Sequence, residues 1–236
     1  MTVSLILPCY NPPQGWEENI VTNYTAFCRK IKQPAELIVV LDGESRSLAA
    51  DSVPHLQQLI PGVQVIAYAT NMGKGHAIRE GVKIAKGDII LYTDIDFPYT
   101  IESMFSIYSG LLKNEYDLGV GIKDDAYYKH VPVARKFISR LLRAMIRVCL
   151  SIPITDTQCG LKGFRCILKP RFLQTGINRY LFDLEFIRNC YKDKKIRIKA
   201  IPVTLNEQVH FRKMNYSILL PEMLNFAALL FKKPNG

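Results

Sequence analysis

The chain has 236 residues, of which 48% are hydrophobic and 22% are charged, so it can bury a sizeable core and is not intrinsically disordered. Its formal net charge is +10, but residues 1–118 carry 9 basic and 13 acidic side chains, whereas residues 119–236 carry 22 and 8. The basic excess belongs to the second half alone, which argues against a uniformly basic nucleic-acid-binding surface. We therefore expect no nucleic-acid partner.

Short runs rich in Val, Ile and Leu alternate with longer helical patterns through the first half. The runs are bounded by Pro, Gly, Asp or Asn and predict strands at residues 3–7, 36–41, 63–68 and 88–92. The segments between them predict helices at residues 17–32, 49–59 and 74–85. Such alternation, with strands apolar on both faces, predicts an α/β fold with a mainly parallel sheet flanked by helices.

Polar or acidic residues follow the end of each of these four strands. In chain order the sets are Pro8 with Tyr10 and Asn11, Asp42 with Gly43, residues 71–75, and Asp94 with Asp96. In open parallel sheets, ligands bind outside the carboxyl ends of the strands. The four sets together therefore indicate one shared binding site.

The second half of the chain is less regular. It predicts a long helix opened by Pro132 at residues 133–150, a second helix at 181–191 and an edge strand at 196–201. A final apolar helix is predicted at residues 217–231, where Pro221 interrupts it early. This helix lies in a C-terminal amphipathic segment, residues 209–236, which we expect to follow one domain formed by residues 1–208.

The six cysteines are scattered without a C-x-x-C pair, which is typical of reduced thiols rather than of a disulfide framework. We expect no signal peptide, because the first residues lack a basic segment and a cleavage site. No run reaches the roughly 18 uncharged apolar residues of a membrane-spanning helix. The nearest run, residues 214–231, contains Pro221 and Glu222. These features predict a cytoplasmic location.

Asp94 and Asp96 stand one residue apart just past a predicted buried strand. Two carboxylates held at the mouth of a sheet form an oxygen-rich site that suits Mg²⁺ or Mn²⁺. A cation held there would have positions open for diphosphate oxygens and would stabilise a departing nucleoside diphosphate. The alternative is a capping or turn role for one aspartate, since Asp is common at such positions. The other strand-end sets favour the metal site.

The glycine-rich stretch at residues 71–75 has two interpretations. A dinucleotide-binding fingerprint is disfavoured, because it needs G-x-G-x-x-G/A in a first strand–helix unit, and this stretch lies in the third. A turn that opens a helix, with Lys74 and the backbone amides facing a phosphate, fits the residues better.

The ordered series of motifs resembles the inverting family-2 glycosyltransferases with the GT-A fold. It comprises Tyr10-Asn11, Asp42-Gly43, Asn71-x-Gly73-Lys74-Gly75-x-Ala77-x-Arg79-x-Gly81, Ala85-x-Gly87-Asp88, and Asp94-x-Asp96. Motifs of the second half resemble the polyprenyl-phosphate branch, which includes dolichyl-phosphate mannose and glucose synthases. They comprise Arg135-Lys136, the stretch from Asp156 to Lys162, and Phe182-Asp183-x-Glu185. The resemblance covers residues 3–202.

The resemblance implies a role for each matching position. Asp42 would contact the nucleobase or ribose, and Asp94 and Asp96 would form the metal pair, with Asp96 the more direct ligand. The other substrate-binding positions are Pro8, Tyr10, Asn11, Lys74, Lys123, Arg135, Arg212 and Lys213. Asp96, Arg135, Asp156 and Asp183 are the catalytic candidates; Asp156 and Asp183 either act directly or orient basic side chains.

Two positions depart from the branch. Pro12 and Pro13 replace a glutamate that often follows Tyr-Asn, and Phe97-Pro98 supplies no further polar ligand after the aspartate pair.

The basic second half favours a phosphate acceptor. A sugar hydroxyl needs a general base, whereas a phosphomonoester is largely dianionic at neutral pH and can attack unaided. Such an enzyme needs cations that hold two phosphate groups in line. Together with the resemblance, this predicts hexose transfer from a UDP- or GDP-linked sugar to polyprenyl or dolichyl phosphate. The alternatives are transfer to a glycan or glycolipid hydroxyl and a non-catalytic nucleotide-sugar-binding module.

A basic stripe on the helix at residues 133–150 predicts contact with an anionic membrane surface. Its members fall at helical spacing beside an apolar face: Lys136, Arg140, Arg143 and Arg147. The apolar segment 217–231, followed by Lys232 and Lys233, offers a second contact. The alternative is an ordinary solvated face. We expect a peripheral protein on the cytoplasmic face of a membrane.

Overall fold

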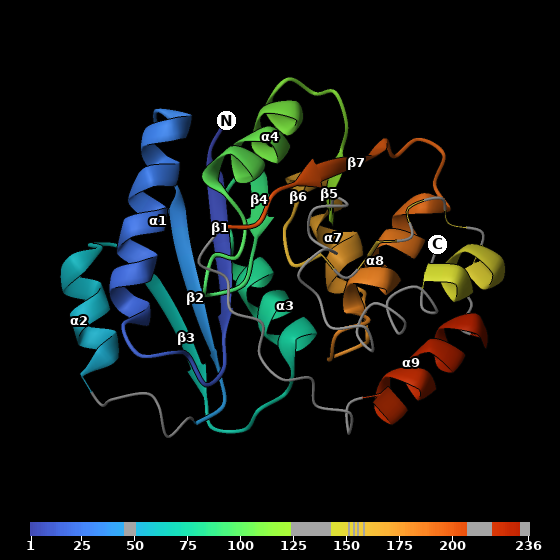
Figure 1. Cartoon of the computed structure of the whole chain (residues 1–236), viewed down its shortest axis with the longest axis horizontal. Helices are drawn as coiled ribbons and strands as arrows, with labels where there is room; N and C mark the ends of the chain where they lie inside the picture. The colour runs from blue at the N-terminus through green and yellow to red at the C-terminus, as the bar shows by residue number, and fades with distance from the viewer. Residues whose placement is uncertain are drawn as a thin grey trace.

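The computed structural model describes residues 1–44, 51–123, 143–150, 152, 154, 156–157, 159–206 and 219–231. Within them, seven strands form one sheet in the order β3-β2-β1-β4-β6-β5-β7 (Figure 1). The strands are β1 (Val3–Cys9), β2 (Glu36–Asp42), β3 (Gln64–Tyr68), β4 (Ile89–Tyr92), β5 (Leu118–Lys123), β6 (Lys162–Arg165) and β7 (Ile198–Val203). Neighbouring strands pair in parallel, except that β6 runs antiparallel to β4 and β5. The predicted mainly parallel sheet is confirmed.

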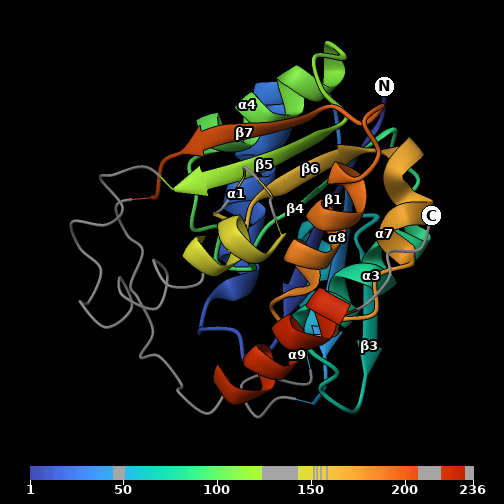
Figure 2. The same cartoon turned by 90° about the vertical axis from the view of Figure 1, so that its right-hand side faces the viewer.

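Helices cover both faces of the sheet. They are α1 (Trp16–Ile31), α2 (Ser52–Leu59), α3 (Lys74–Ile84), α4 (Ile101–Leu112), the 3₁₀ turn η1 (Cys166–Leu168), α7 (Lys169–Leu173), α8 (Phe182–Tyr191) and α9 (Leu219–Phe231). Residues 143–150 are also helical. Figures 1 and 2 show α1, α2 and α4 on one face, and α3, α7, α8 and α9 on the other.

Alternate side chains of the central strands fill two apolar layers. In β1, Leu5 and Leu7 belong to the layer that contains Phe27 of α1, whereas Ile6 belongs to the layer that contains Ile78 of α3. Because both faces are covered, these strands are apolar at nearly every position. The pairing of the strands brings the carboxyl ends of β1 to β5 and of β7 to one edge of the sheet.

The predicted elements of the first half are confirmed to within a few residues. Of the predicted helix at residues 133–150, the structure describes residues 143–150, which are helical, and leaves 133–142 outside its description. The final helix and the edge strand are also confirmed, as α9 and β7. The sequence analysis did not predict α4, β5 or β6. The proposed domain boundary at residues 208 and 209 falls outside the described residues.

Helix α9 packs against the body of the protein on one side only. Phe226 and Leu229 are buried in the same layer as α3 and α8, whereas Met223, Leu224 and Phe231 are 63%, 65% and 87% exposed. Glu222 Oε2 accepts a hydrogen bond of 3.1 Å from the backbone of Leu181, just before α8. None of the described helices has the length and apolar character needed to cross a membrane.

Candidate active site

The reversed strand β6 places a second chain segment beside the end of β4. Tyr92, the last residue of β4, pairs with Lys162, the first residue of β6. In an antiparallel pair the chains continue in opposite directions, so Asp94 comes to lie opposite Gly160. A Cβ atom at Gly160 would stand 2.2 Å from Asp94 Oδ2, which means that only glycine leaves room for this carboxylate.

Lys74, the first residue of α3, donates a hydrogen bond to Asp94 Oδ1 and forms an ion pair with it. The side chains of Lys74 and Asp94 are 19% and 37% exposed. Burial alone would raise the pKa of Asp94, but the charge and hydrogen bond of Lys74 outweigh it and lower that pKa. Lys162 and Lys123 act on Asp94 in the same direction. Asp94 is therefore an ionised carboxylate surrounded by cations.

Asp96 lies on a tight turn whose shape is fixed by neighbouring segments. The turn has a backbone hydrogen bond of 3.0 Å from Phe97 to Asp94 O, and Phe97 itself adopts a left-handed φ of 46° while its side chain is buried. Asn206, beyond β7, donates from Nδ2 to Phe97 O at 2.7 Å and to Tyr99 O at 3.3 Å. Asp96 is exposed at the surface of this turn.

A second, fully buried ion pair lies beneath the turn. Lys162 Nζ is 2.9 Å from Asp183 Oδ2, and the two side chains are 0% and 6% exposed. Lys162 also donates to Cys159 O at 2.5 Å, and Tyr92 donates from its hydroxyl to Asp183 Oδ1 at 2.5 Å. Burial, and then the charge of Asp183, hold the pKa of Tyr92 well above its usual value. Every charge of this pair is hydrogen-bonded inside the protein.

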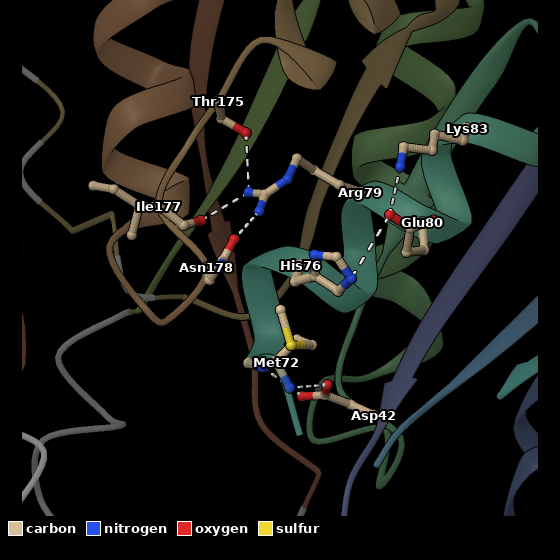
Figure 3. A network of polar contacts seen from close by, with 10 residues as sticks. Asp42, Met72, His76, Arg79, Glu80, Lys83, Thr175, Ile177 and Asn178 are labelled. Carbon is tan, nitrogen blue, oxygen red and sulfur yellow. Dashed lines mark hydrogen bonds and ion pairs between the residues drawn. The ribbon is translucent and has the colours of Figure 1, made fainter. Parts of the chain in front are cut away.

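Asp42, at the end of β2, binds the loop that follows β3. Its two carboxylate oxygens accept hydrogen bonds from the backbone amides of Met72 and Gly73, at 2.7 and 2.9 Å (Figure 3). Asn71 returns a hydrogen bond of 3.1 Å to Asp42 O. Asp42 is 2% exposed, so its carboxylate is engaged by the protein.

The first amides of α3 also donate to a protein oxygen. Gly75 and His76 donate from their backbone nitrogens to Asn178 O, at 2.7 and 3.2 Å. A Cβ atom at Gly73 would stand 2.6 Å from Asn178 O, and one at Gly75 would stand 2.6 Å from Ile177 O. The expectation that these amides face a phosphate was wrong for this structure, because a carbonyl oxygen of a neighbouring loop accepts their hydrogen bonds instead. The glycines allow that loop to approach.

Arg79 holds the same loop from the side of α3. Its guanidinium donates to Ile177 O at 2.8 Å, to Thr175 Oγ1 at 3.4 Å and to Asn178 Oδ1 (Figure 3). Glu185 accepts from the backbone of Gly176 and Ile177, each at 2.8 Å. The motif from Asn71 to Arg79 and the Asp183–Glu185 motif, far apart in sequence, therefore fix one loop, residues 174–181.

The remaining predicted positions have varied surroundings. Pro8 is buried, Tyr10 is 49% exposed, and Asn11 adopts a left-handed φ of 46°. Asp156 accepts a hydrogen bond of 2.8 Å from the backbone of Lys123, so it holds the end of β5. Arg135, Arg212 and Lys213 lie outside the described residues. The roles proposed for all these residues stay predictions.

The structure thus brings Asp94, Lys74, Lys123 and Asp183 to one edge of the sheet. It adds Gly160, Lys162 and Asn206, to which the sequence analysis gave no role. Gly160 and Lys162 stand in the motif that begins at Asp156, but their function depends on the pairing of β6 with β4. Asn206 belongs to no recognised motif, and nothing in the sequence identified it.

The residues at the turn fit a hard divalent cation that is shared with a ligand. Asp94 and Asp96 supply carboxylate oxygens, which Mg²⁺ and Mn²⁺ prefer, and glycine at position 160 leaves room for the carboxylate of Asp94. Among the described residues there is no cluster of three or more His, Cys, Asp or Glu side chains able to hold a metal ion. Two carboxylates suit a cation whose other ligands are phosphate oxygens or water.

Curated relatives resemble the chain over most of its length. A dolichyl-phosphate β-glucosyltransferase of Trichomonas vaginalis is 29% identical over 87% of this chain and 66% of its own length. The Dictyostelium discoideum enzyme of the same description is 24% identical over 86% of this chain and 65% of its own length. An undecaprenyl-phosphate 4-deoxy-4-formamido-L-arabinose transferase of Serratia proteamaculans is 28% identical over 69% and 48%. The chain thus spans less than two thirds of these relatives.

Solved structures share the fold of this chain, and a family model matches its sequence. Glucosyl-3-phosphoglycerate synthase of Mycobacterium tuberculosis superposes with a TM-score of 0.65 at 17% identity, covering 97% of this chain and 79% of that one. Mannosyl-3-phosphoglycerate synthase of Rubrobacter xylanophilus gives 0.68 at 14%, covering 97% and 72%. These matches establish the GT-A fold. Residues 4–168 match the family described as Glycosyl transferase family 2, and the chain belongs to that family.

Proposed function

We propose that the chain transfers a hexose, with inversion, from a UDP- or GDP-linked sugar to polyprenyl or dolichyl phosphate at a membrane surface. In this reaction an acceptor phosphate oxygen forms a bond to the anomeric carbon while the bond from that carbon to the donor diphosphate breaks. The nucleoside diphosphate leaves. The curated relatives, which are named for transfer to dolichyl and undecaprenyl phosphate, support this choice of acceptor.

The observation that carries the proposal is the turn after β4. Lys74 contacts the carboxylate of Asp94, Lys123 acts on Asp94 from the end of β5, and Asp96 is exposed two residues further along the turn. Carboxylates and ammonium groups at one sheet edge can bind a cation and a diphosphate together. A purely structural pair would not need the exposed turn that this chain maintains.

Mg²⁺ or Mn²⁺ is the proposed cofactor, held by Asp94 and Asp96, and when bound it would neutralise charge that develops on the leaving diphosphate. Glucosyl-3-phosphoglycerate synthase of Mycobacterium tuberculosis has been solved in complex with UDP and either Mn²⁺ or Mg²⁺, which supports that cofactor. Lys74 and Lys123 would hold the diphosphate in the direction required for displacement. Arg135, Arg212 and Lys213 are proposed to bind the acceptor phosphate.

The partners of the buried carboxylates favour an acceptor that needs no general base. Asp183 is engaged by Lys162 and Tyr92, Asp156 holds the backbone of Lys123, and Asp42 holds the loop after β3. A sugar hydroxyl would require a carboxylate poised to take its proton, whereas a phosphate dianion does not. Asp156 and Asp183 are therefore proposed to position basic groups.

Contact with the membrane is proposed for residues 209–236 and for the helix that carries Arg143 and Arg147. The exposed apolar side chains of α9, which include Met223, Leu224 and Phe231, support an interfacial role. The proposed location is the cytoplasmic face of a membrane, as a peripheral protein. Binding to vesicles that contain anionic lipid should fall in high salt and in the Arg143→Gln/Arg147→Gln variant. Binding that is indifferent to both changes would contradict the interfacial role.

The transfer reaction is tested with a panel of donors and acceptors. The protein is incubated with Mn²⁺ or Mg²⁺ and nucleotide sugars, beginning with nucleotide-linked glucose, with and without dolichyl or undecaprenyl phosphate. Released nucleoside diphosphate is measured. We expect release that depends on the polyprenyl phosphate and falls by at least about 100-fold in Asp96→Asn, because one ligand of the leaving group's cation is lost.

The matched control is Asp51→Asn, since Asp51 is an exposed aspartate whose side chain caps no amide of α2. It should transfer sugar like the unaltered protein. Release that requires a glycan hydroxyl in place of polyprenyl phosphate would select the hydroxyl-acceptor alternative. Binding of nucleotide sugar without any release would select the binding module.

A further inference from the structure

We propose that Lys74 is an exchangeable counterion of Asp94, which a divalent cation bound to a diphosphate must displace. The cation alone would then bind weakly, and the cation and diphosphate would favour each other's binding. This inference rests on the proposed function, because it concerns the same site. It adds a specific role for Lys74, that of competing with the cation.

The contact itself is the first argument. Lys74 Nζ is hydrogen-bonded to Oδ1 of Asp94, and Oδ2 faces Gly160, where a Cβ atom would stand 2.2 Å away. One side of the carboxylate therefore carries an ammonium group and the other faces the backbone of the segment before β6. A divalent cation cannot share Oδ1 with an ammonium group at hydrogen-bond distance without strong repulsion. Lys74 must move for the cation to bind through that oxygen.

Only the side chain of Lys74 is free to make this movement. The backbone on both sides is fixed, because Gly73 donates to Asp42 Oδ2 and Gly75 donates to Asn178 O. The lysine side chain has four rotatable bonds and is 19% exposed. The ammonium group can leave Asp94 while helix α3 stays in place.

The buried pair beneath the turn distinguishes this exchangeable contact from a fixed one. Asp183 is already held by Lys162 and Tyr92, both of which are fully buried. Its negative charge attracts Lys74, but its two oxygens are occupied by these partners. Once displaced, Lys74 would remain near the site while its partner Asp94 is taken up by the cation. A diphosphate supplies the missing anion.

Charge balance then couples the two ligands. A divalent cation alone would displace Lys74 and leave two like-charged groups side by side. A diphosphate alone would meet the carboxylates of Asp94 and Asp96. Together, the cation takes the carboxylates and the diphosphate takes Lys74, so each ligand removes the repulsion that the other meets. Such coupling is reciprocal by thermodynamic necessity.

The test measures Mn²⁺ binding without any sugar or acceptor. Free Mn²⁺ is followed by electron paramagnetic resonance in titrations of the unaltered protein, Lys74→Met and Lys74→Arg. We expect Lys74→Met to bind Mn²⁺ at least about ten-fold more tightly than the unaltered protein, because the competing cation is gone, and Lys74→Arg to bind it as weakly as the unaltered protein. With inorganic pyrophosphate present at one fixed total concentration, the order of binding should reverse. Lys74→Met should then bind less Mn²⁺–pyrophosphate than the unaltered protein or Lys74→Arg.

Two further variants complete the test. Lys83→Met removes an exposed lysine of the same helix that pairs with Glu80, and it should leave Mn²⁺ binding unchanged. Adding Asp94→Asn to Lys74→Met should abolish the gain, since the gain belongs to that carboxylate. Mn²⁺ binding no tighter in a folded Lys74→Met protein would overturn the inference. That result would leave the proposed sugar transfer unaffected. A failure of sugar transfer would contradict the proposed function, and the Mn²⁺ titration would still decide whether Lys74 competes with the cation.

Discussion

Two regions at the same edge of the sheet use their motif residues in opposite ways. Around the start of α3, the described residues that follow β2 and β3 and the loop at residues 174–181 bind one another through hydrogen bonds. We call this the closed region. The turn after β4, the open region, keeps Asp94 37% exposed and Asp96 at the surface. The closed region is held together by its own hydrogen bonds, and the open region is the one that we propose binds a ligand.

The difference changes what the glycine-rich motif means. Its sequence pattern suggests amides that cradle a phosphate, but here the amides of residues 72, 73, 75 and 76 all donate to protein oxygens. What the motif delivers to the open region is one side chain, Lys74. A helix N-terminus can thus serve a ligand site through the residue it anchors rather than through its own amides.

The largest effect on stability is expected for the buried ion pair of Lys162 and Asp183, compared with the pair of Lys74 and Asp94. Lys162→Met should lower the free energy of unfolding by about 3–5 kcal/mol, because it leaves Asp183 buried without its cation. Lys74→Met should cost no more than about 1 kcal/mol, since its partner Asp94 is partly exposed and screened by solvent. Urea unfolding followed by circular dichroism measures both.

Equal losses for the two variants would break the distinction between a fixed pair and an exchangeable one. The Lys162→Met/Asp183→Leu double variant sharpens it further. Removing both charges should recover part of the lost stability, because no uncompensated buried charge remains. A double variant less stable than Lys162→Met would show that the unpaired charge of Asp183 does not account for the loss.

The next effect concerns the glycines of the closed region. Gly73 and Gly62 both have left-handed φ values, 100° and 89°, but a Cβ atom at Gly73 meets Asn178 O at 2.6 Å, whereas one at Gly62 meets nothing within 4 Å. Gly62→Ala should cost about 1–2 kcal/mol from the backbone alone. Gly73→Ala should cost roughly 3 kcal/mol, because overpacking against the loop adds to the strain. Thermal unfolding gives the difference, and equal costs would mean that the loop yields.

A smaller effect separates two aspartates at the same edge of the sheet, one at the end of β2 and one after β4. Asp42→Asn should cost about 2 kcal/mol of stability, because an amide can accept only one of the two backbone hydrogen bonds that the carboxylate accepts. Asp96→Asn should change stability by less than about 0.5 kcal/mol, as expected of an exposed position. Differential scanning calorimetry compares them. A stable Asp42→Asn protein that has lost only nucleotide binding would mean that Asp42 binds the ligand and is not needed to hold the closed region together.

The sequence predicted the layered sheet and the composition of its working edge, but it did not predict how residues pair there. The strands of the first half are continuous apolar runs bounded by turn residues, so their local pattern identifies them. The short strand β6, from Lys162 to Arg165, is four residues long and contains glycine and two charges, and only its pairing with β4 makes it a strand. The contacts of Asp94 with Lys74 and Gly160 depend on that pairing.

Helix α4 escaped prediction for a different reason. Its residues follow Pro98 and Thr100 without the charged pattern of a surface helix, and it is recognised from its cap, where Thr100 Oγ1 accepts from the backbone of Ser103 at 3.3 Å. The contact of the glycine-rich turn with Asn178 could not be predicted from the sequence either, because Asn178 is about a hundred residues away along the chain. Long-range contacts of this kind decide whether a polar group is used by the protein or by a ligand.

The smallest effect tests Glu222 of α9, which binds the end of the loop at residues 174–181. Glu222 of α9 accepts from Leu181 through Oε2, while its Oε1 is buried without a hydrogen-bond partner among the described residues. Burial raises the pKa of Glu222, although the amides of Leu181 and Tyr180 oppose the shift. Because the folded protein then holds this proton more tightly than the unfolded chain, the contribution of Glu222 to stability is fully present below the unfolded pKa and is lost as pH rises through the folded value.

Glu222→Gln keeps an acceptor for Leu181 and does not titrate. Hydrogen exchange of the α9 amides should therefore quicken between pH 4.5 and 7.5 more in the unaltered protein than in Glu222→Gln, after correction for the intrinsic pH dependence of exchange. The same acceleration in both proteins would mean that α9 docks on residues 180 and 181 through Phe226 and Leu229 alone, and that the closed region ends at α8.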